Sequence, residues 1–113
     1  MMPTKEFSKT KTKELRALIE EATIDANDTQ EQLMGLATML KEGVELPFEA
    51  KVIGEQVTVI DLEQAGDGFG IKAVCKRGNH KYKVDLTSIE WVAPLPAGFK
   101  WIEAYLEWQR TQS

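Results

Sequence analysis

The stretch FEAKVIGEQVTVIDL, residues 48–62, decides the fold. On either side of Gly54, its Val, Ile and Phe residues recur at every second position. This alternation is typical of half-buried β-strands, and the single glycine between the two halves predicts a hairpin turn. We therefore expect a two-stranded hairpin within a larger strand region that runs from residue 46 to residue 92.

The rest of this region contains three more segments with strand character. A third strand is expected over residues 71–76 and a fourth over residues 81–86, joined by the two-residue turn Gly78-Asn79. A last short strand is expected over residues 89–92, whereas the glycine-rich residues 64–70 predict a loop. Five short strands of this spacing predict a small, partly open barrel of the Src-homology-3-like kind.

Helices are predicted on both sides of the strand region. Apolar residues at steps of three and four predict a helical hairpin over residues 12–43, whose apolar faces should lie on the strands. Asp28 or Thr29 is the expected cap of its second helix, and Gly43 should end that helix in a left-handed conformation. A C-terminal helix over residues 99–110 should close one open end of the barrel.

Length and composition predict a single α+β domain. A chain of 113 residues can bury an apolar core, and 42% hydrophobic residues exclude a wholly disordered protein. Residues 1–11, which are polar, are expected to form a flexible N-terminus. The single Cys75 excludes an internal disulfide, and no apolar run has the length of a signal peptide or a membrane span. We therefore expect a cytoplasmic protein.

Little in the sequence favours catalysis. Cys75 and His80 are the single cysteine and the single histidine, five residues apart across the predicted turn. A nucleophilic pair would need both side chains on one face. We interpret Cys75 instead as a buried core residue and His80 as a turn residue. The sequence contains no zinc-ligand set, phosphate-binding loop or nucleophile elbow. We therefore expect that the protein is not an enzyme.

Acidic and basic residues are segregated along the chain, although the net charge is only −4. Residues 20–67 hold twelve acidic residues against two lysines, whereas residues 68–86 hold five basic residues against one aspartate. Two carboxylates 4 Å apart repel each other by about 4 kcal/mol at an effective dielectric constant of 20. A bound divalent cation would relieve this repulsion. The alternative is a solvated acidic surface that only improves solubility.

Residues 24–31, IDANDTQE, combine acidic residues with turn residues, as calcium sites do. They do not form an EF-hand, because the sixth position of such a loop would be Gln30 rather than glycine and the twelfth would be Leu36 rather than glutamate. A calcium site of another kind stays open, with further oxygens from the strand region. The candidate ligands are Asp25, Asn27, Asp28 and Glu31 with Glu49, or at a second place Asp61, Glu63 and Asp67.

Basic residues gather on the predicted third and fourth strands. They could bind an anionic partner, or they could protect an edge strand against aggregation. Because few aromatic residues lie among them, these residues favour a protein partner over a nucleic acid. The candidate partner-binding residues are Lys72, Lys76, Arg77, Lys81 and Lys83.

Four segments carry a family resemblance: IEEATIDANDTQEQLMG (19–35), LPFEAKVIGEQVTV (46–59), IKAVCKRG (71–78) and WIEAYLEW (101–108). In these segments the chain resembles the small bacterial calcium-binding proteins typified by cyanobacterial CcbP. The resemblance covers about residues 15–108 and implies a Src-homology-3-like barrel whose acidic surface binds calcium reversibly, as a buffer or a sensor. The positions that match recurring family patterns are Asp25, Glu31 and Glu49.

The expected function is therefore calcium binding without catalysis. The alternative is a metal-independent interaction module that docks a protein or nucleic-acid partner through segregated acidic and basic faces.

Overall fold

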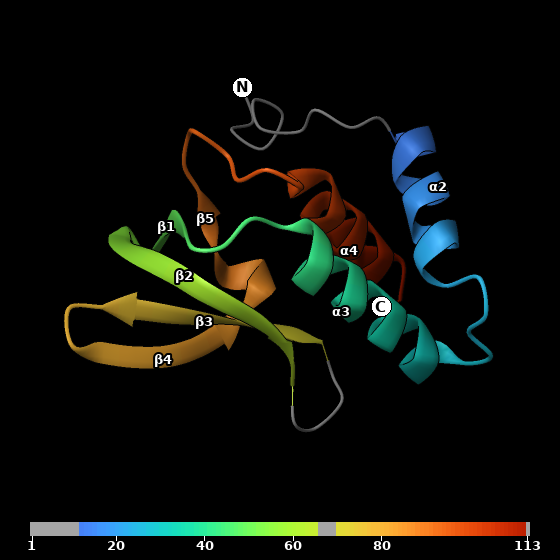
Figure 1. The fold of residues 1–113 in the computed structure, drawn as a ribbon, viewed down its shortest axis with the longest axis horizontal. Coiled ribbons are helices and arrows are strands. Elements are labelled where there is room, and N and C mark those ends of the chain that lie inside the picture. Colours follow the sequence, from blue (N-terminus) through green and yellow to red (C-terminus); the bar gives the residue numbers. More distant parts are fainter. Residues whose placement is uncertain (1–11, 66–69, 113) are drawn as a thin grey trace.

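A computed structural model describes residues 12–65 and 70–112. The predicted flexible N-terminus, residues 1–11, lies outside this part of the chain, as do residues 66–69 with the candidate ligand Asp67. The described residues form an α+β fold, in which three helices lie on one side of a five-stranded antiparallel sheet (Figure 1).

The sheet has the strand order β4-β3-β2-β1-β5, and every neighbouring pair is antiparallel. Its two outer strands, β4 and β5, are not paired with each other, so the sheet is open. The strand order confirms a five-stranded antiparallel sheet. The more specific fold, a Src-homology-3-like barrel, stays a prediction. The strands are β1 Phe48–Val52, β2 Glu55–Gln64, β3 Ile71–Arg77, β4 His80–Asp85 and β5 Glu90–Trp91, with a 3₁₀ turn, η1 Leu86–Ser88, between the last two.

The central hairpin forms where the sequence predicts it. Its turn consists of Ile53 and Gly54, which both have positive φ, at 49° and 75°. Two left-handed residues in a two-residue turn match the right-handed twist of the flanking strands. In β1, buried residues alternate with the exposed Glu49 and Lys51, which confirms the predicted half-buried pattern.

A β-bulge changes the phase of β2. The pairing with β3 shifts between Val59 and Asp61, so that Ile60 is the extra residue. After the bulge, Leu62 is fully buried, and its neighbours Asp61 and Glu63 are half-buried. Both carboxylates therefore lie on the side of β2 opposite the side chain of Leu62.

The helices are α2 Thr12–Ala22, α3 Thr29–Gly43 and α4 Phe99–Gln112. Helix α3 lies on β2, whereas α2 packs against α4 and α3 (Figure 1). The prediction that both helices of the hairpin lie on the strands is therefore right for α3 and wrong for α2. Because α2 is covered from one side only, Leu15 is its single fully buried residue.

Gly43 does not end α3 in a left-handed conformation, so that prediction is wrong. Gly43 is the last helical residue, and the following Val44 is extended. A Cβ atom at Gly43 would lie 2.6 Å from Cδ1 of Trp101, and one at Gly98 would collide with the carbonyl oxygen of Gly43. Gly43 is therefore needed because α3 closely approaches the start of α4 at this residue.

Helix α4 is the most deeply buried helix. Five consecutive residues, 101–105, are buried, because α2, α3 and the sheet surround this part of the helix. The hydroxyl oxygen of Tyr105 accepts a hydrogen bond of 3.0 Å from the backbone N–H of Ile71, at the start of β3. Among the described residues, no helix is long and apolar enough to cross a membrane.

Candidate functional site

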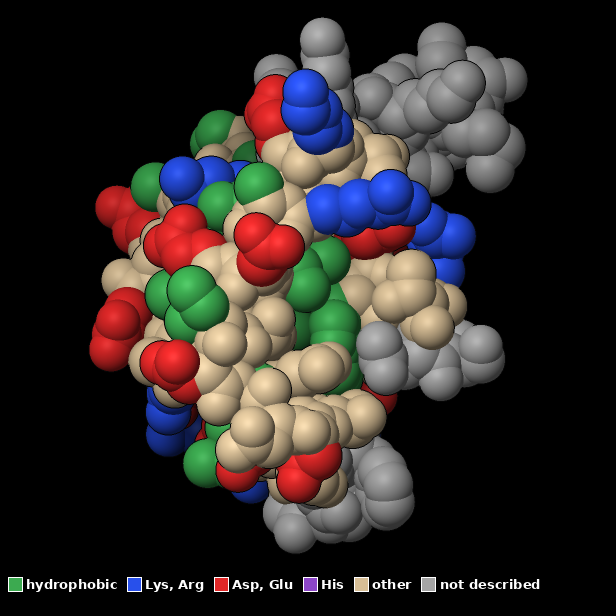
Figure 2. Space-filling model, turned by 90° about the vertical axis from the view of Figure 1, so that its right-hand side faces the viewer, with side chains coloured by type: hydrophobic (Ala, Val, Ile, Leu, Met, Phe, Trp, Pro, Cys, Tyr) green, Lys and Arg blue, Asp and Glu red, His purple; other side chains and the backbone are tan. Residues whose placement is uncertain are grey.

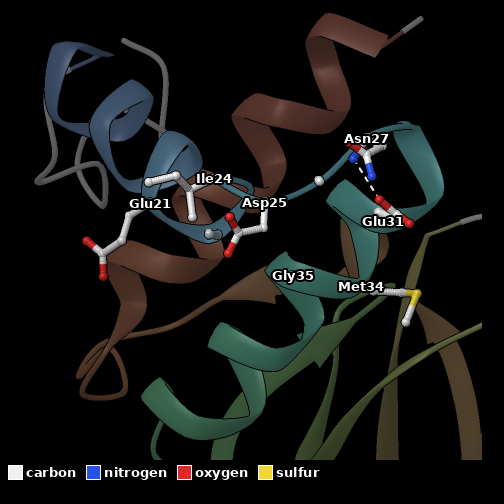
Figure 3. A pocket seen from close by; sticks show the side chains of 9 residues that line it. Glu21, Ile24, Asp25, Asn27, Glu31, Met34 and Gly35 are labelled. Atoms are coloured by element: carbon white, nitrogen blue, oxygen red, sulfur yellow. Dashed lines mark hydrogen bonds between the residues drawn. The ribbon is translucent and has the colours of Figure 1, made fainter.

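A hollow of about 510 Å³ lies where α2 ends and α3 begins (Figure 3). Three carboxylates line it: Glu21 from the last turn of α2, Asp25 from the connecting loop and Glu31 from the first turn of α3. The exposed apolar side chains of Ile24 and Met34 lie beside them. The hollow is thus an acidic surface with an apolar margin.

A reciprocal cap shapes the loop side of the hollow. Asp28 is the N-cap of α3, as predicted, and its carboxylate accepts a hydrogen bond of 2.8 Å from the backbone N–H of Glu31. The carboxylate of Glu31 in turn accepts a hydrogen bond of 2.6 Å from the backbone N–H of Asn27. The carboxylates of Asp28 and Glu31 therefore each accept a backbone hydrogen bond that holds the loop in place.

Close contact between α2 and α3 forms the floor of the hollow. Gly35 lies so near the last turn of α2 that a Cβ atom there would collide with the carbonyl oxygen of Ala22. The hydroxyl of Thr23 donates to the carbonyl oxygen of Ile19 at 2.7 Å, which closes the end of α2. The loop is consequently anchored at both ends.

Asp25 is a carboxylate of the hollow that no other described residue binds, as is Glu21. It is exposed and makes no hydrogen bond or ion pair within residues 12–65 and 70–112. Figure 3 shows it between Glu21 and Glu31. It is therefore available to a cation without loss of an existing contact.

The residue types around the hollow suit calcium, but their oxygens are not gathered. Carboxylates and loop carbonyls are the hard oxygen ligands that calcium prefers. In the described part of the chain, however, no three or more His, Cys, Asp or Glu side chains are grouped so that they could hold a metal ion. Figure 2, which faces α2 and the start of α3, shows acidic side chains standing apart from one another. A cation would have to draw these side chains together.

Glu49 does not lie with the loop residues. It points to the outer face of β1, and its carboxylate accepts hydrogen bonds from Gln56, at 3.1 Å, and from Thr58, at 2.9 Å. Since α3 covers the other face of the sheet, Glu49 is separated from the Asp25 loop by the sheet itself.

Asp61 and Glu63 lie on one face of β2, and lysines neutralise both. Lys41 of α3 is 3.9 Å from Asp61, and Lys83 of β4 is 2.5 Å from Glu63. Asp61 also accepts a hydrogen bond from the backbone N–H of Leu62. Their proposed companion Asp67 is outside the described residues.

The acidic and basic segments meet in part across the strands. Besides the pair of Lys83 with Glu63, Arg77 of β3 forms an ion pair of 2.8 Å with Glu55 of β2. Within the described ranges, the other three candidate cations form no ion pair with a carboxylate; they are Lys72, Lys76 and Lys81.

Cys75 and His80 have the surroundings of structural residues. Cys75 is fully buried, and the loss of solvent raises the pKa of its thiol. His80 is exposed where β4 begins. A buried thiol with a raised pKa is a poor nucleophile.

A family model described as calcium binding, Calci_bind_CcbP, matches residues 16–109. The chain belongs to the CcbP calcium-binding family. Two solved structures share the fold of this CcbP family member. The crystal structure of Anabaena CcbP has a TM-score of 0.76 at 21% identity and covers 89% of this chain and 93% of its own. A calcium binding protein in its calcium-binding form has a TM-score of 0.71 at 22% identity, with 98% of each chain covered. No curated protein matches the sequence.

Sequence reasoning did not single out Glu21, Ile24 or Met34, which are among the residues that line the hollow in this CcbP family member. Glu21 had a detectable signal, because it lies four residues before Asp25 at the end of a predicted helix. The exposed Ile24 and Met34 had none, since an apolar residue in an amphipathic helix or at its end is normally expected to be covered.

Proposed function

We propose that this protein binds calcium reversibly and catalyses no reaction, acting as a buffer or a sensor. The observation that carries the proposal is the calcium-binding family match over residues 16–109. The oxygen-rich hollow between α2 and α3 supports it.

The proposed ligands are Asp25 and Glu31, together with Glu21 and the side-chain oxygen of Asn27. All four line the hollow, and they come from three successive segments of the chain. Asp28 is assigned to the helix cap instead of the ion, because the backbone N–H of Glu31 depends on it. The pair Asp61 and Glu63, with Asp67, is the alternative place for the ion.

Calorimetric titration with calcium, with magnesium as the control, tests the function. Calcium should release or absorb heat at a defined stoichiometry and raise the melting temperature. A ligand at a hundred times its Kd stabilises the native state by about 2.7 kcal/mol, and chelation should reverse this gain. Absence of both heat and thermal shift at millimolar calcium would overturn the proposal.

Two matched variants test the site. Asp25→Asn and Asp28→Asn each remove one negative charge from the same loop, but asparagine at residue 28 keeps a good helix cap. We expect Asp25→Asn to weaken calcium binding about tenfold or more and Asp28→Asn to weaken it only about twofold. Equal effects would point to a diffuse charge effect.

A third variant tests the alternative place. If Asp61→Asn abolishes calcium binding while Asp25→Asn does not, the ion binds at β2 and the hollow is not the site. That result would leave the calcium-binding function itself intact.

A further inference from the structure

Two lysines lie directly opposite each other on the outer face of the sheet. Lys76 of β3 and Lys81 of β4 are cross-strand partners, and like charges in such a pair destabilise a hairpin. The neighbour of Lys76 on its other side is Thr58 of β2, whose hydroxyl already donates to Glu49. Within the described residues neither lysine forms an ion pair, so the pair is an uncompensated positive site.

The same lysines lie next to an unpaired strand edge. β4 is the last strand of the sheet order, and no other described strand pairs with its outer side. The two-residue turn makes Arg77 and His80 the hydrogen-bonded pair that closes the hairpin. Because hydrogen-bonded and non-hydrogen-bonded pairs alternate, Lys81 and Lys83 direct their backbone N–H and C=O groups away from β3.

The inner side of the same edge is apolar. Tyr82 and Val84 alternate with the two lysines of β4, and both pack against the core while staying only half-buried. β4 therefore offers three things together: backbone groups without a strand partner, positive charge on one side and uncovered apolar surface on the other.

We propose that the β4 edge binds an extended peptide in which acidic and apolar side chains alternate. Such a peptide would add a sixth strand, with its backbone paired to Lys81 and Lys83. Its carboxylates would lie beside Lys76 and Lys81, and its apolar side chains would lie beside Tyr82 and Val84. The proposal is independent of calcium binding.

Charge and shape favour a peptide over other anionic partners. Single-stranded nucleic acids bind through aromatic side chains on which bases stack, but Tyr82, the aromatic residue of this hairpin, lies on the inner side. A second copy of β4 would bring the lysines of both copies together. An acidic strand avoids both difficulties.

Protection against aggregation explains only part of the arrangement. Lysines on an edge strand repel other edges, which accounts for Lys81 and Lys83. It does not account for Lys76, which lies on the inner strand β3, where a lysine opposite Lys81 is expected to destabilise the hairpin. Lysines that repel a basic strand also favour an acidic one.

The test uses a fluorescein-labelled peptide of alternating glutamate and valine, with fluorescence anisotropy at low salt as the readout. We expect saturable binding and slower hydrogen exchange at the backbone amides of Lys81 and Lys83. A control peptide of the same composition, with its glutamates clustered at one end, should bind about tenfold more weakly.

The variant Lys81→Glu gives the sharpest prediction. It places an acidic residue opposite Lys76, so it should raise the melting temperature of the protein while weakening peptide binding about tenfold or more. The matched control is Lys51→Glu, which reverses an exposed lysine of β1 on the same outer face. It should leave peptide affinity within about twofold.

Three results would overturn the proposal. They are no binding of the alternating peptide at millimolar protein, equal binding of the clustered control peptide, and tighter binding of a single-stranded oligonucleotide of the same charge.

Discussion

Ile53 occupies a backbone conformation that does not suit it. Its φ is 49°, and the residue is 88% exposed at the tip of the central hairpin. A left-handed conformation costs an ordinary L-residue about 1–2 kcal/mol, and a β-branched residue is a poor choice for it. The exposed side chain recovers little of this cost through burial.

Replacing Ile53 with asparagine should therefore stabilise the protein. Asparagine tolerates the left-handed conformation and forms the favoured Asn-Gly turn with Gly54. We expect a gain of about 1 kcal/mol in the free energy of unfolding, or a rise of about 4 °C in melting temperature. Thermal unfolding measures it, with Gly54→Ala as a control that should destabilise. An unchanged or lower melting temperature for Ile53→Asn would contradict the assignment of strain.

Burial gives Cys75 and Tyr105 a pH-dependent effect on stability. Loss of solvent raises the pKa of each side chain in the folded state, so the folded chain holds these protons more tightly than the unfolded chain. Their contribution to stability is complete at neutral pH. It is lost as the pH rises above 9, because the unfolded chain then releases the protons first.

Urea unfolding between pH 7 and pH 11 measures this loss of stability. Cys75→Ala and Tyr105→Phe should each reduce the slope of unfolding free energy against pH, even if each variant is less stable at pH 7. The pH assignment would be wrong if both variants kept the slope of the parent protein.

At the scale of elements, local signals predicted most of the structure. Alternation in residues 48–62 and the glycines of both hairpin turns are read within a few residues, and the strands formed as expected. The cap at Asp28 was equally local. The position of α2 was not predictable, because an amphipathic face shows that a helix is covered but not which element covers it. Gly43 was misassigned because a glycine that permits close packing looks the same as one that ends a helix.

In the candidate site, too, residues close in sequence were grouped correctly, whereas residues from distant segments were not. Asp25, Asn27 and Glu31 were predicted together and lie at one hollow, because they are near neighbours in the chain. Glu49 was grouped with them, but the alternation of β1 places it on the far side of the sheet. Which acidic residues share a face after a bulge, as in β2, could not be read without the pairing register.

Gly35→Ala tests the contact between α2 and α3. In an exposed helix this change would stabilise by about 1 kcal/mol. Here the new Cβ would collide with the backbone of Ala22, so we expect a loss of about 1–3 kcal/mol and weaker calcium binding at the hollow. Chemical unfolding decides the sign, with Thr38→Ala in the same helix as the control. A stabilised Gly35→Ala variant would show that the two helices are not closely packed.

At the scale of the whole molecule, the helices are attached unequally. Helix α3 lies against the sheet and α4 is buried on several sides, whereas α2 contacts chiefly the other helices and has one fully buried side chain, Leu15. Regions with few buried apolar contacts open at lower free energy than the core.

Hydrogen exchange should therefore rank the three helices. We expect the amides of α2 to exchange faster than those of α3 and α4, and calcium to slow exchange in α2 more than in the sheet. Uniform exchange across all three helices would contradict the ranking.

The outer position of α2 also has a bearing on signalling. An ion bound at the proposed site would join the end of α2 to the start of α3, and would thus act on the helix with the fewest buried residues. The ion concentration would then set the fraction of molecules in which α2 is packed against α3 and α4. The rest of the domain would keep the same structure at every ion concentration.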